Sequence, residues 1–303
     1  MKKEIKNLPA SIHARLKRRA VEMQRSFQEI FYFYAFEGFL HRLSLSQYRN
    51  RFILKGGLAF RGWGINLRRP TRDIDFNAYI NDSVEAVASV IKEICNLNVE
   101  DGLIFDTNSF QTTTTMTGAE YEGVRIRFKT YLGRAYLWLQ VDISFANVIT
   151  PKEISFEYPI LLERPTFELW GYNRETAIAE KFQSMIFLGL FNGRLKDYYD
   201  IYLLAKEGAM HGSTLGKALA ATFTHRNTAI PSNIPAALSD DFINMNRDEW
   251  LRFLRNTNYP NEDIKDLKGV IEFLRMFLLP PMQAAANGDD FDRNWTAEHG
   301  WTS

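Results

Sequence analysis

Residues 54–77 read LKGGLAFRGWGINLRRPTRDIDFN, and the end of this stretch decides the fold. Asp73 and Asp75 stand one residue apart in a run that is otherwise typical of a buried strand. In a strand, residues i and i+2 point to the same face, so we expect the two carboxylates side by side, ~7 Å apart at the backbone, with Ile74 and Phe76 toward the core. Two ionised carboxylates repel at this range, which calls for protonation, a basic neighbour or a divalent cation.

The glycine pair Gly56 and Gly57 precedes this strand and ends an apolar run. A short helix predicted from Leu58 would aim free backbone N–H groups at an anion, which makes the glycine turn a candidate phosphate site. Nucleotidyl transfer needs a phosphate site beside a carboxylate pair, because Mg²⁺ bridges the triphosphate and the carboxylates. The structural alternative is that Arg69 and Arg72 neutralise the aspartates, and Arg72 is also a candidate nucleotide contact.

A third acid lies in residues 137–145, LWLQVDISF, where apolar and polar residues alternate. The alternation places Asp142 on the polar face of another strand. There it is a candidate ligand for a second metal ion, or a base for the attacking hydroxyl. A lone strand aspartate is also a common device for protecting a sheet edge, so this assignment depends on the pair.

The second half of the chain offers a lysine and two further acids on predicted helices. Lys181 lies in AEKFQSM, while Asp197 and Asp200, spaced i and i+3 in RLKDYYDIY, share one helix face. Lys181 is a candidate for neutralising a substrate phosphate. A salt bridge between Lys181 and Asp197 or Asp200 is the structural alternative, and the two roles are compatible.

Length and composition are those of a globular protein with two domains. The chain has 303 residues, 46% hydrophobic and 24% charged, and a net charge of +1. Its single cysteine, Cys95, excludes a disulfide framework and favours the cytoplasm. The apolar run 27–40 is too short to span a bilayer, so no membrane association is expected.

The periodicity predicts helices from Pro9 to about Leu45, then strands and a helix at 83–95, then further strands to about residue 165. The chain is mostly helical from Glu175 onward. We therefore predict an α+β sheet domain with N-terminal helices over residues 1–165, a helical domain over 166–286 and a loose tail over 287–303. The basic positions of the first helix, a candidate RNA contact, are Arg15, Arg18 and Arg19.

Taken in order, these motifs resemble the AbiEii/AbiGii nucleotidyltransferase toxins, which are relatives of DNA polymerase β. The resemblance covers roughly residues 10–205 and is carried by LKGGLAF, RPTRDIDF, VDISF, IAEKFQSM and RLKDYYDIY. It implies a polymerase-β-like nucleotidyltransferase sheet domain followed by a helical domain. Many relatives have Gly-Asp where this chain has Ala146-Asn147, and superfamily members often have Gly-Ser in place of the glycine pair.

The resemblance also implies roles for residues of each motif. It implies a glycine motif at Gly56 and Gly57, metal-binding acids at Asp73 and Asp75, a third acid at Asp142, an essential lysine at Lys181 and late acids at Asp197 and Asp200.

The activity implied is transfer of NMP from an NTP, with two Mg²⁺ ions, to an RNA such as the 3′ end of tRNA. This would block translation and cause growth arrest or abortive phage infection, and a cognate antitoxin is expected as partner. Two alternatives remain open: the same site could modify a protein, as a nucleotidyltransferase or kinase, or the chain could be a non-catalytic module that binds NTP or RNA.

Overall fold

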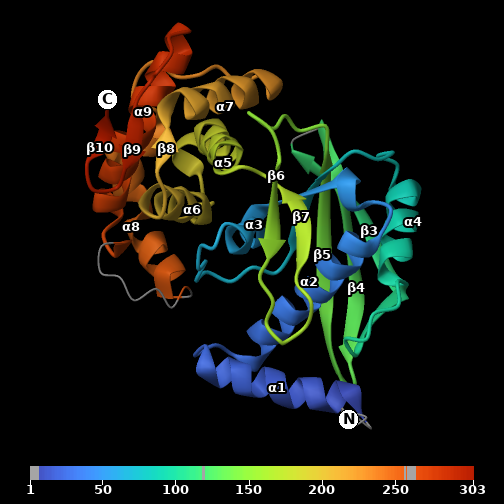
Figure 1. Ribbon diagram of the computed structural model, residues 1–303. Helices are drawn as coiled ribbons and strands as arrows, with labels where there is room; N and C mark the ends of the chain where they lie inside the picture. Colours follow the sequence, from blue (N-terminus) through green and yellow to red (C-terminus); the bar gives the residue numbers. More distant parts are fainter. Residues whose placement is uncertain (1–6, 118–119, 256, 258–263) are drawn as a thin grey trace. The chain divides into compact units, whose positions relative to one another are not determined.

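The computed structural model describes residues 7–117, 120–255, 257 and 264–303 (Figure 1). The chain forms two compact units, Met1–Asn147 with Ile154–Gly171, and Val148–Glu153 with Tyr172–Ser303. The predicted boundary near residue 165 falls inside the segment Ile154–Gly171 of the first unit. Among the described residues, no helix combines the length and the apolar character needed to cross a bilayer.

The helices of the first unit follow the predicted periodicity. They are α1 (Leu8–Glu22), α2 (Phe27–Leu45), the 3-10 turn Arg49–Arg51, α3 (Gly56–Gly62) and α4 (Val84–Cys95). Ser26 caps α2 by accepting a hydrogen bond from the Glu29 N–H at 3.1 Å, so the second helix begins at Phe27. Ser83 caps α4 by accepting a hydrogen bond from the Ala86 N–H at 3.3 Å.

Within the described residues, seven strands form one mixed sheet in the order β3-β4-β5-β2-β1-β7-β6. The strands are β1 (Phe52–Lys55), β2 (Ile74–Ala78), β3 (Leu103–Thr117), β4 (Glu120–Leu132), β5 (Ala135–Phe145), β6 (Ile154–Tyr158) and β7 (Phe167–Gly171). β2 runs parallel to β5, and β1 runs parallel to β7; the other neighbours are antiparallel. The long strand β3 has a register shift against β4 between Asp106 and Gln111.

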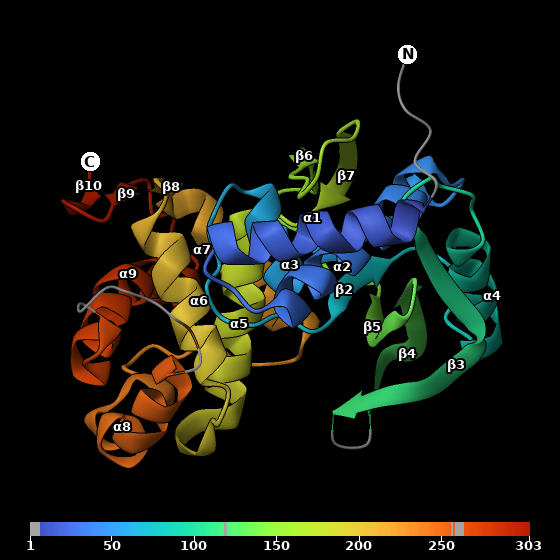
Figure 2. The same cartoon turned by 90° about the horizontal axis from the view of Figure 1, so that it is seen from below.

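The core of the first unit lies between the sheet and helices α2 and α4, which cover one face of β2–β5 (Figures 1 and 2). Phe39 of α2 packs on rings from three strands, with centroid distances of 6.4 Å to Phe76, 6.2 Å to Phe105 and 6.3 Å to Phe128. Because strand residues alternate between faces, the polar residues of β2, β4 and β5 point away from this core. That second face carries the predicted site.

The second unit is helical with a small sheet. Its helices are α5 (Arg174–Leu188), the 3-10 turn Gly189–Phe191, α6 (Leu195–Lys206), α7 (Gly212–His225), the 3-10 turn Ala236–Leu238, α8 (Asp240–Arg255) and α9 (Leu267–Asn287). β8 (Met210–His211), β9 (Asn294–Thr296) and β10 (Gly300–Thr302) pair in the order β10-β9-β8.

The C-terminal residues differ from the loose tail predicted for 287–303. Trp295 of β9 is buried, and its Nε1 donates to the Ala205 carbonyl at 2.8 Å. Trp301 of β10 likewise donates to the Phe277 carbonyl at 2.9 Å. Three-residue strands have no readable periodicity, and these depend on tryptophan packing against α6 and α9 rather than on a local pattern.

Candidate active site

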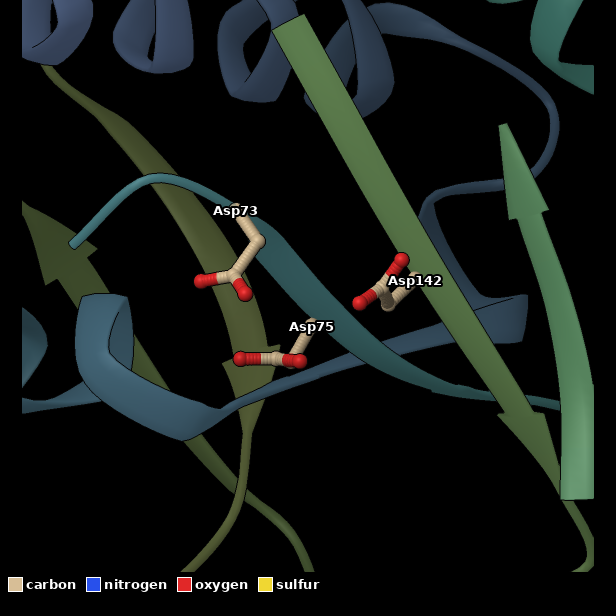
Figure 3. A group of neighbouring side chains, drawn as sticks. All are labelled: Asp73, Asp75 and Asp142. Atoms are coloured by element: carbon tan, nitrogen blue, oxygen red, sulfur yellow. The ribbon is translucent and has the colours of Figure 1, made fainter. Parts of the chain in front are cut away.

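Asp73, Asp75 and Asp142 come together on the open face of the sheet. A carboxylate oxygen from each lies within 4.8 Å of the others, and all three residues are half-buried (Figure 3). Asp73 immediately precedes β2, Asp75 lies within β2, and Asp142 lies on the neighbouring β5. Their side chains converge from the two strands in Figure 3, so the predicted group of three acids is present in the structure.

The local sequence explains why these acids point outward. Ile74 and Phe76 are fully buried on either side of Asp75, and Val141 and Ile143 are buried around Asp142. Burying these apolar neighbours fixes the strand register, because a slip by one residue would turn the acids into the core. The predicted alternation of β2 and β5 therefore aims the carboxylates at the same region.

Cross-strand register sets the acids between two basic residues. Lys55 of β1 lies opposite Asp75, Asp75 lies opposite Asp142, and Asp142 lies opposite Arg125 of β4. Opposed residues share one face of the sheet, on strands about 4.8 Å apart. These four residues, called here the charged row, carry two acids flanked by a cation at each end.

Arg125 holds Asp142 with two hydrogen bonds. Its Nε donates to Oδ1 and its Nη2 to Oδ2, both at 2.8 Å, and Gln140 Nε2 also donates to Oδ2 at 3.1 Å. These hydrogen bonds raise the pKa of Arg125 above its ordinary value, with the nearby charges of Asp73 and Asp75 adding to the effect and desolvation opposing it. The guanidinium is therefore a permanent positive charge that orients the third acid.

Neither Arg125 nor Lys55 was among the predicted basic neighbours, which were Arg69 and Arg72. Arg69 is buried, and its Nη1 donates to the Pro70 carbonyl at 3.3 Å. Arg72 is exposed, and its contact with a nucleotide stays a prediction. Only strand pairing places Arg125 opposite Asp142.

Gly56 is required where β1 turns into α3. Its φ is +66°, a left-handed conformation that favours glycine, and a Cβ there would overlap the carboxylate of Asp75. A Cβ on Gly57 would lie 2.5 Å from Thr71 Oγ1. The glycine pair thus gives Asp75 and Thr71 the room they occupy. A phosphate contact at this turn stays a prediction, and the seven-residue α3 is too short to add a large helix dipole.

The geometry of the acids fits a divalent cation. Carboxylate oxygens are hard ligands of the kind that Mg²⁺ prefers, and three of them converge within the span of one coordination sphere. Oδ2 of Asp142 accepts two hydrogen bonds, whereas Oδ1 accepts one, which leaves Oδ1 one lone pair for a metal or a proton. Asp73, Asp75 and Oδ1 of Asp142 are the atoms that would hold the ion.

The second unit brings together the three other predicted residues. Lys181 Nζ of α5 lies 3.1 Å from Asp197 Oδ1 and 2.6 Å from Asp200 Oδ2 on α6. Arg194 Nε lies 2.9 Å from Asp197 Oδ2. Both aspartates are fully buried, while the Lys181 side chain is 13% exposed. The expected salt bridge is present with both acids, which fix the position of the lysine; a phosphate contact by Lys181 stays a prediction.

A comparison of the sequence with known families gives a match over most of the chain. The model of the family described as "Nucleotidyl transferase AbiEii toxin, Type IV TA system" matches residues 38–286. The chain belongs to this family. The resemblance drawn from the motifs is therefore confirmed, and this AbiEii protein is a nucleotidyltransferase toxin of a type IV toxin–antitoxin system.

Family membership implies an NTP substrate and an antitoxin partner for this AbiEii protein. Searching curated sequences gives no match. Among solved structures, the nucleotidyltransferase toxin MenT4 from Mycobacterium tuberculosis H37Rv is similar, with 17% identity, 69% of this chain and 68% of that chain covered, and a TM-score of 0.46. JHP933 from Helicobacter pylori is similar with 14% identity, 87% and 94% covered, and a TM-score of 0.45.

Proposed function

We propose that this AbiEii protein transfers NMP from an NTP to the 3′ end of an RNA, with tRNA as the first candidate acceptor. The observation that carries the proposal is the convergence of Asp73, Asp75 and Asp142 within 4.8 Å on an open sheet face. A bound Mg²⁺ pair would supply Lewis acidity at the α-phosphate and at the attacking oxygen. Asp73 and Asp75 would hold these ions.

In the proposed reaction, the RNA 3′ oxygen forms a bond to the α-phosphorus, and the bond from this phosphorus to the bridging oxygen of pyrophosphate breaks. The hydroxyl proton goes to the free lone pair of Asp142 Oδ1 or to water. Arg125 keeps Asp142 in place and adds a positive charge beside the developing phosphate charge. Lys181, which Asp197 and Asp200 hold in position in the second unit, would offer a positive charge to a substrate phosphate.

The acceptor is tested by incubating the purified protein with Mg²⁺, total tRNA and each α-labelled NTP in turn. We expect label in RNA from one or two nucleotides, and a loss of about 100-fold or more in Asp75→Asn, since metal-ion stabilisation of the transition state amounts to several kcal/mol. Glu157→Gln, a change of charge at an exposed position of β6 in the same sheet, is the control.

Label in protein instead of RNA would replace this proposal with protein nucleotidylation, and γ-label in protein would replace it with a kinase reaction. NTP binding without any labelled product would indicate a non-catalytic module.

The cellular consequence is tested separately. Producing the protein in the cytoplasm of a bacterial host without its antitoxin should arrest the growth of the cells, and Asp75→Asn should relieve the arrest. Normal growth of the wild-type strain would contradict the proposed toxicity.

A further inference from the structure

Beside the aspartates, the open face of the sheet carries a run of basic and aromatic side chains. On β4 and β5, residues opposite each other along this face are Arg125 and Asp142, Arg127 and Gln140, Lys129 and Trp138, and Tyr131 and Tyr136. The intervening residues Val124, Ile126 and Phe128 are buried against the helices. The run therefore starts at the third acid and continues along the same two strands.

The cations and rings of this run are interleaved. The Arg127 guanidinium lies 5.7 Å from the Trp138 ring centroid, and Lys129 Nζ lies 5.6 Å from that of Trp138 and 5.9 Å from that of Tyr136. The rings of Tyr131 and Tyr136 lie 5.8 Å apart. We call Arg127, Lys129, Tyr131, Tyr136 and Trp138 the cation–aromatic face.

This face is accessible. Tyr136 is 58% exposed, Arg127 is exposed, and Lys129, Tyr131 and Trp138 are half-buried. Helices α2 and α4 cover the other side of these strands (Figure 2). Such exposure of large rings is unusual on a sheet face that has only a structural purpose, because their burial would stabilise the fold.

The chemistry of the face fits a single-stranded nucleic acid. Exposed rings provide stacking surfaces for bases, and neighbouring cations neutralise phosphates, which is the combination that binds single strands without sequence preference. A duplex keeps its bases stacked inside, so it cannot use the rings in this way. Asp106 of β3 lies opposite Lys129, but its Oδ1 accepts from the Asn108 N–H at 3.0 Å in the irregular part of β3.

We propose that the cation–aromatic face binds the unpaired 3′ end of the acceptor RNA and leads it to the aspartates; the identity of the strand as acceptor rests on the proposed function. From Tyr136 to Asp142 the strand β5 covers roughly 20 Å, enough for a few nucleotides laid along it. Arg125, at the boundary, belongs both to the charged row and to this path. In this arrangement the acceptor RNA lies along β5 with its 3′ end at the aspartates.

There are two alternatives to RNA binding at the cation–aromatic face: the face could only stabilise the sheet, or the RNA could bind to a different surface. Cross-strand pairs of cations and rings stabilise sheets, and the face could have this effect alone. RNA could instead bind to α1 through Arg15, Arg18 and Arg19, although Arg19 already pairs with Glu22 at 2.9 Å. The sequence of α1 contains no Phe, Tyr or Trp, so it offers phosphate contacts without stacking.

The test measures binding of a short labelled single-stranded RNA by fluorescence anisotropy, with Asp75→Asn as the parent so that no transfer occurs. In the double variant Tyr136→Ala/Trp138→Ala we expect Kd to rise roughly tenfold or more, as loss of stacking on two rings should give. In Arg127→Gln/Lys129→Gln the slope of log K against log salt should become shallower by about 1.4. An RNA duplex of the same sequence should respond weakly to loss of the rings.

Matched controls use exposed residues elsewhere: Phe187→Ala for the rings, and Lys92→Gln on the covering helix α4 for the cations. Both should bind RNA like the parent. Thermal unfolding is followed in parallel, and Tyr136→Phe/Trp138→Phe keeps flat rings at both positions. If the alanine double variant loses stability as well as affinity, recovery of affinity in the phenylalanine variant supports the face, and failure to recover overturns it.

Parent-like RNA binding in both face variants would overturn the proposal, as would a loss confined to an Arg15→Gln/Arg18→Gln variant. These results are separate from the proposed function. RNA binding that depends on the face, without label transfer in the wild type, would contradict the reaction and leave the face standing. Label transfer to RNA that is unaffected by the face variants would contradict the face and leave the reaction standing.

Discussion

The two charged clusters of this protein are built from the same residue types in opposite ways. In the first unit, Asp73, Asp75 and Asp142 are half-buried and converge from two strands. In the second unit, Asp197 and Asp200 are fully buried and both contact Lys181. The carboxylates of the first cluster are accessible to a ligand, whereas those of the second cluster form ion pairs inside the protein.

The difference teaches which charges are available for chemistry. Buried acids that already contact a lysine and an arginine have lost access to solvent, and their role is to fix the cation. The half-buried acids at the open sheet face stay accessible to a metal ion, even though Arg125 already binds Asp142. We therefore expect substitutions in the second cluster to lower stability in addition to any effect on transfer, and those in the first to act mainly on metal binding and transfer.

The largest expected effect on stability is that of Lys181→Met. This change leaves Asp197 and Asp200 buried without the lysine, and removing one partner of a buried ion pair costs about 3–5 kcal/mol. Asp75→Asn, in contrast, changes a half-buried acid on the open face and should lower the free energy of unfolding less than Lys181→Met does. Urea unfolding followed by circular dichroism measures both variants.

Lys196→Met is the matched control for Lys181→Met, because Lys196 is exposed and adjoins Asp197 in the sequence. It should change the unfolding free energy by no more than a few tenths of a kcal/mol. The contrast between the clusters would be refuted by a reversed order, with Asp75→Asn destabilising more than Lys181→Met.

Arg125→Gln should separate metal affinity from turnover. Loss of a positive charge next to the acids makes the site more negative, which should strengthen Mn²⁺ binding by about 1 kcal/mol, or roughly fivefold, at this half-exposed position. Loss of the two hydrogen bonds frees Asp142 to turn, which should lower the transfer rate by about 10–100-fold. Mn²⁺ titration by electron paramagnetic resonance and the labelled-NTP assay measure the two effects.

Arg125→Lys is the companion variant. It keeps the charge but cannot reproduce the two-point hydrogen bonding, so Mn²⁺ affinity should stay near that of the wild type while transfer remains slow. Weaker Mn²⁺ binding in Arg125→Gln would contradict this interpretation. It would mean that Mn²⁺ affinity depends more on the orientation of Asp142 than on the positive charge of Arg125.

The limits of sequence reasoning are visible at the same site. Period-two alternation was enough to place Asp73, Asp75 and Asp142 on polar strand faces, because it depends only on neighbouring residues. Arg125 was missed because its partner, Asp142, is 17 residues away in the chain, and their contact depends on the register of β4 with β5. Lys55 was missed for the same reason, since only the pairing of β1 with β2 places it opposite Asp75.

Gly56 shows a second limit. The glycine pair was interpreted as a phosphate site, a role that stays a prediction, whereas the structure gives the residue a steric role beside Asp75. Likewise, the burial of Trp295 could not be predicted in a segment without periodicity, because it depends on contacts with residues far away in the chain, such as Ala205. Patterns within a strand or helix are readable from sequence, but contacts between elements require the fold.

Gly56→Ala should lower transfer about tenfold, because the added Cβ overlaps the Asp75 carboxylate and must displace it. The left-handed backbone adds roughly 1–2 kcal/mol of strain. Gly64→Ala is the matched control: Gly64 has φ +75°, and a Cβ there has nothing within 4 Å. Gly64→Ala should therefore show the strain in urea unfolding and keep wild-type transfer. Equal loss of transfer in both variants would assign the effect to the backbone alone.

The smallest expected effect is the pH dependence that His41 contributes far from the aspartates. Its ring stacks on Phe167 with centroids 5.1 Å apart, and within the described residues its buried Nδ1 has no hydrogen-bond partner. Burial lowers the pKa of His41, the positive charges of Arg164 and Arg42 lower it further, and Asp101 opposes them. The folded protein therefore binds this proton less readily than the unfolded chain does.

With a folded pKa below the unfolded one, the contribution of His41 to stability is present above about pH 6.5 and is lost as the pH falls toward the folded pKa. Replacing the imidazole by a ring that cannot be protonated, in His41→Phe, should make the unfolding free energy fall less between pH 7.5 and pH 5.5 than it does in the wild type. His225→Gln, at an exposed histidine, must change this difference less than His41→Phe does. If His41→Phe keeps the full pH dependence, the loss of stability in acid comes from other groups, and the half-buried imidazole of His41 has no part in it.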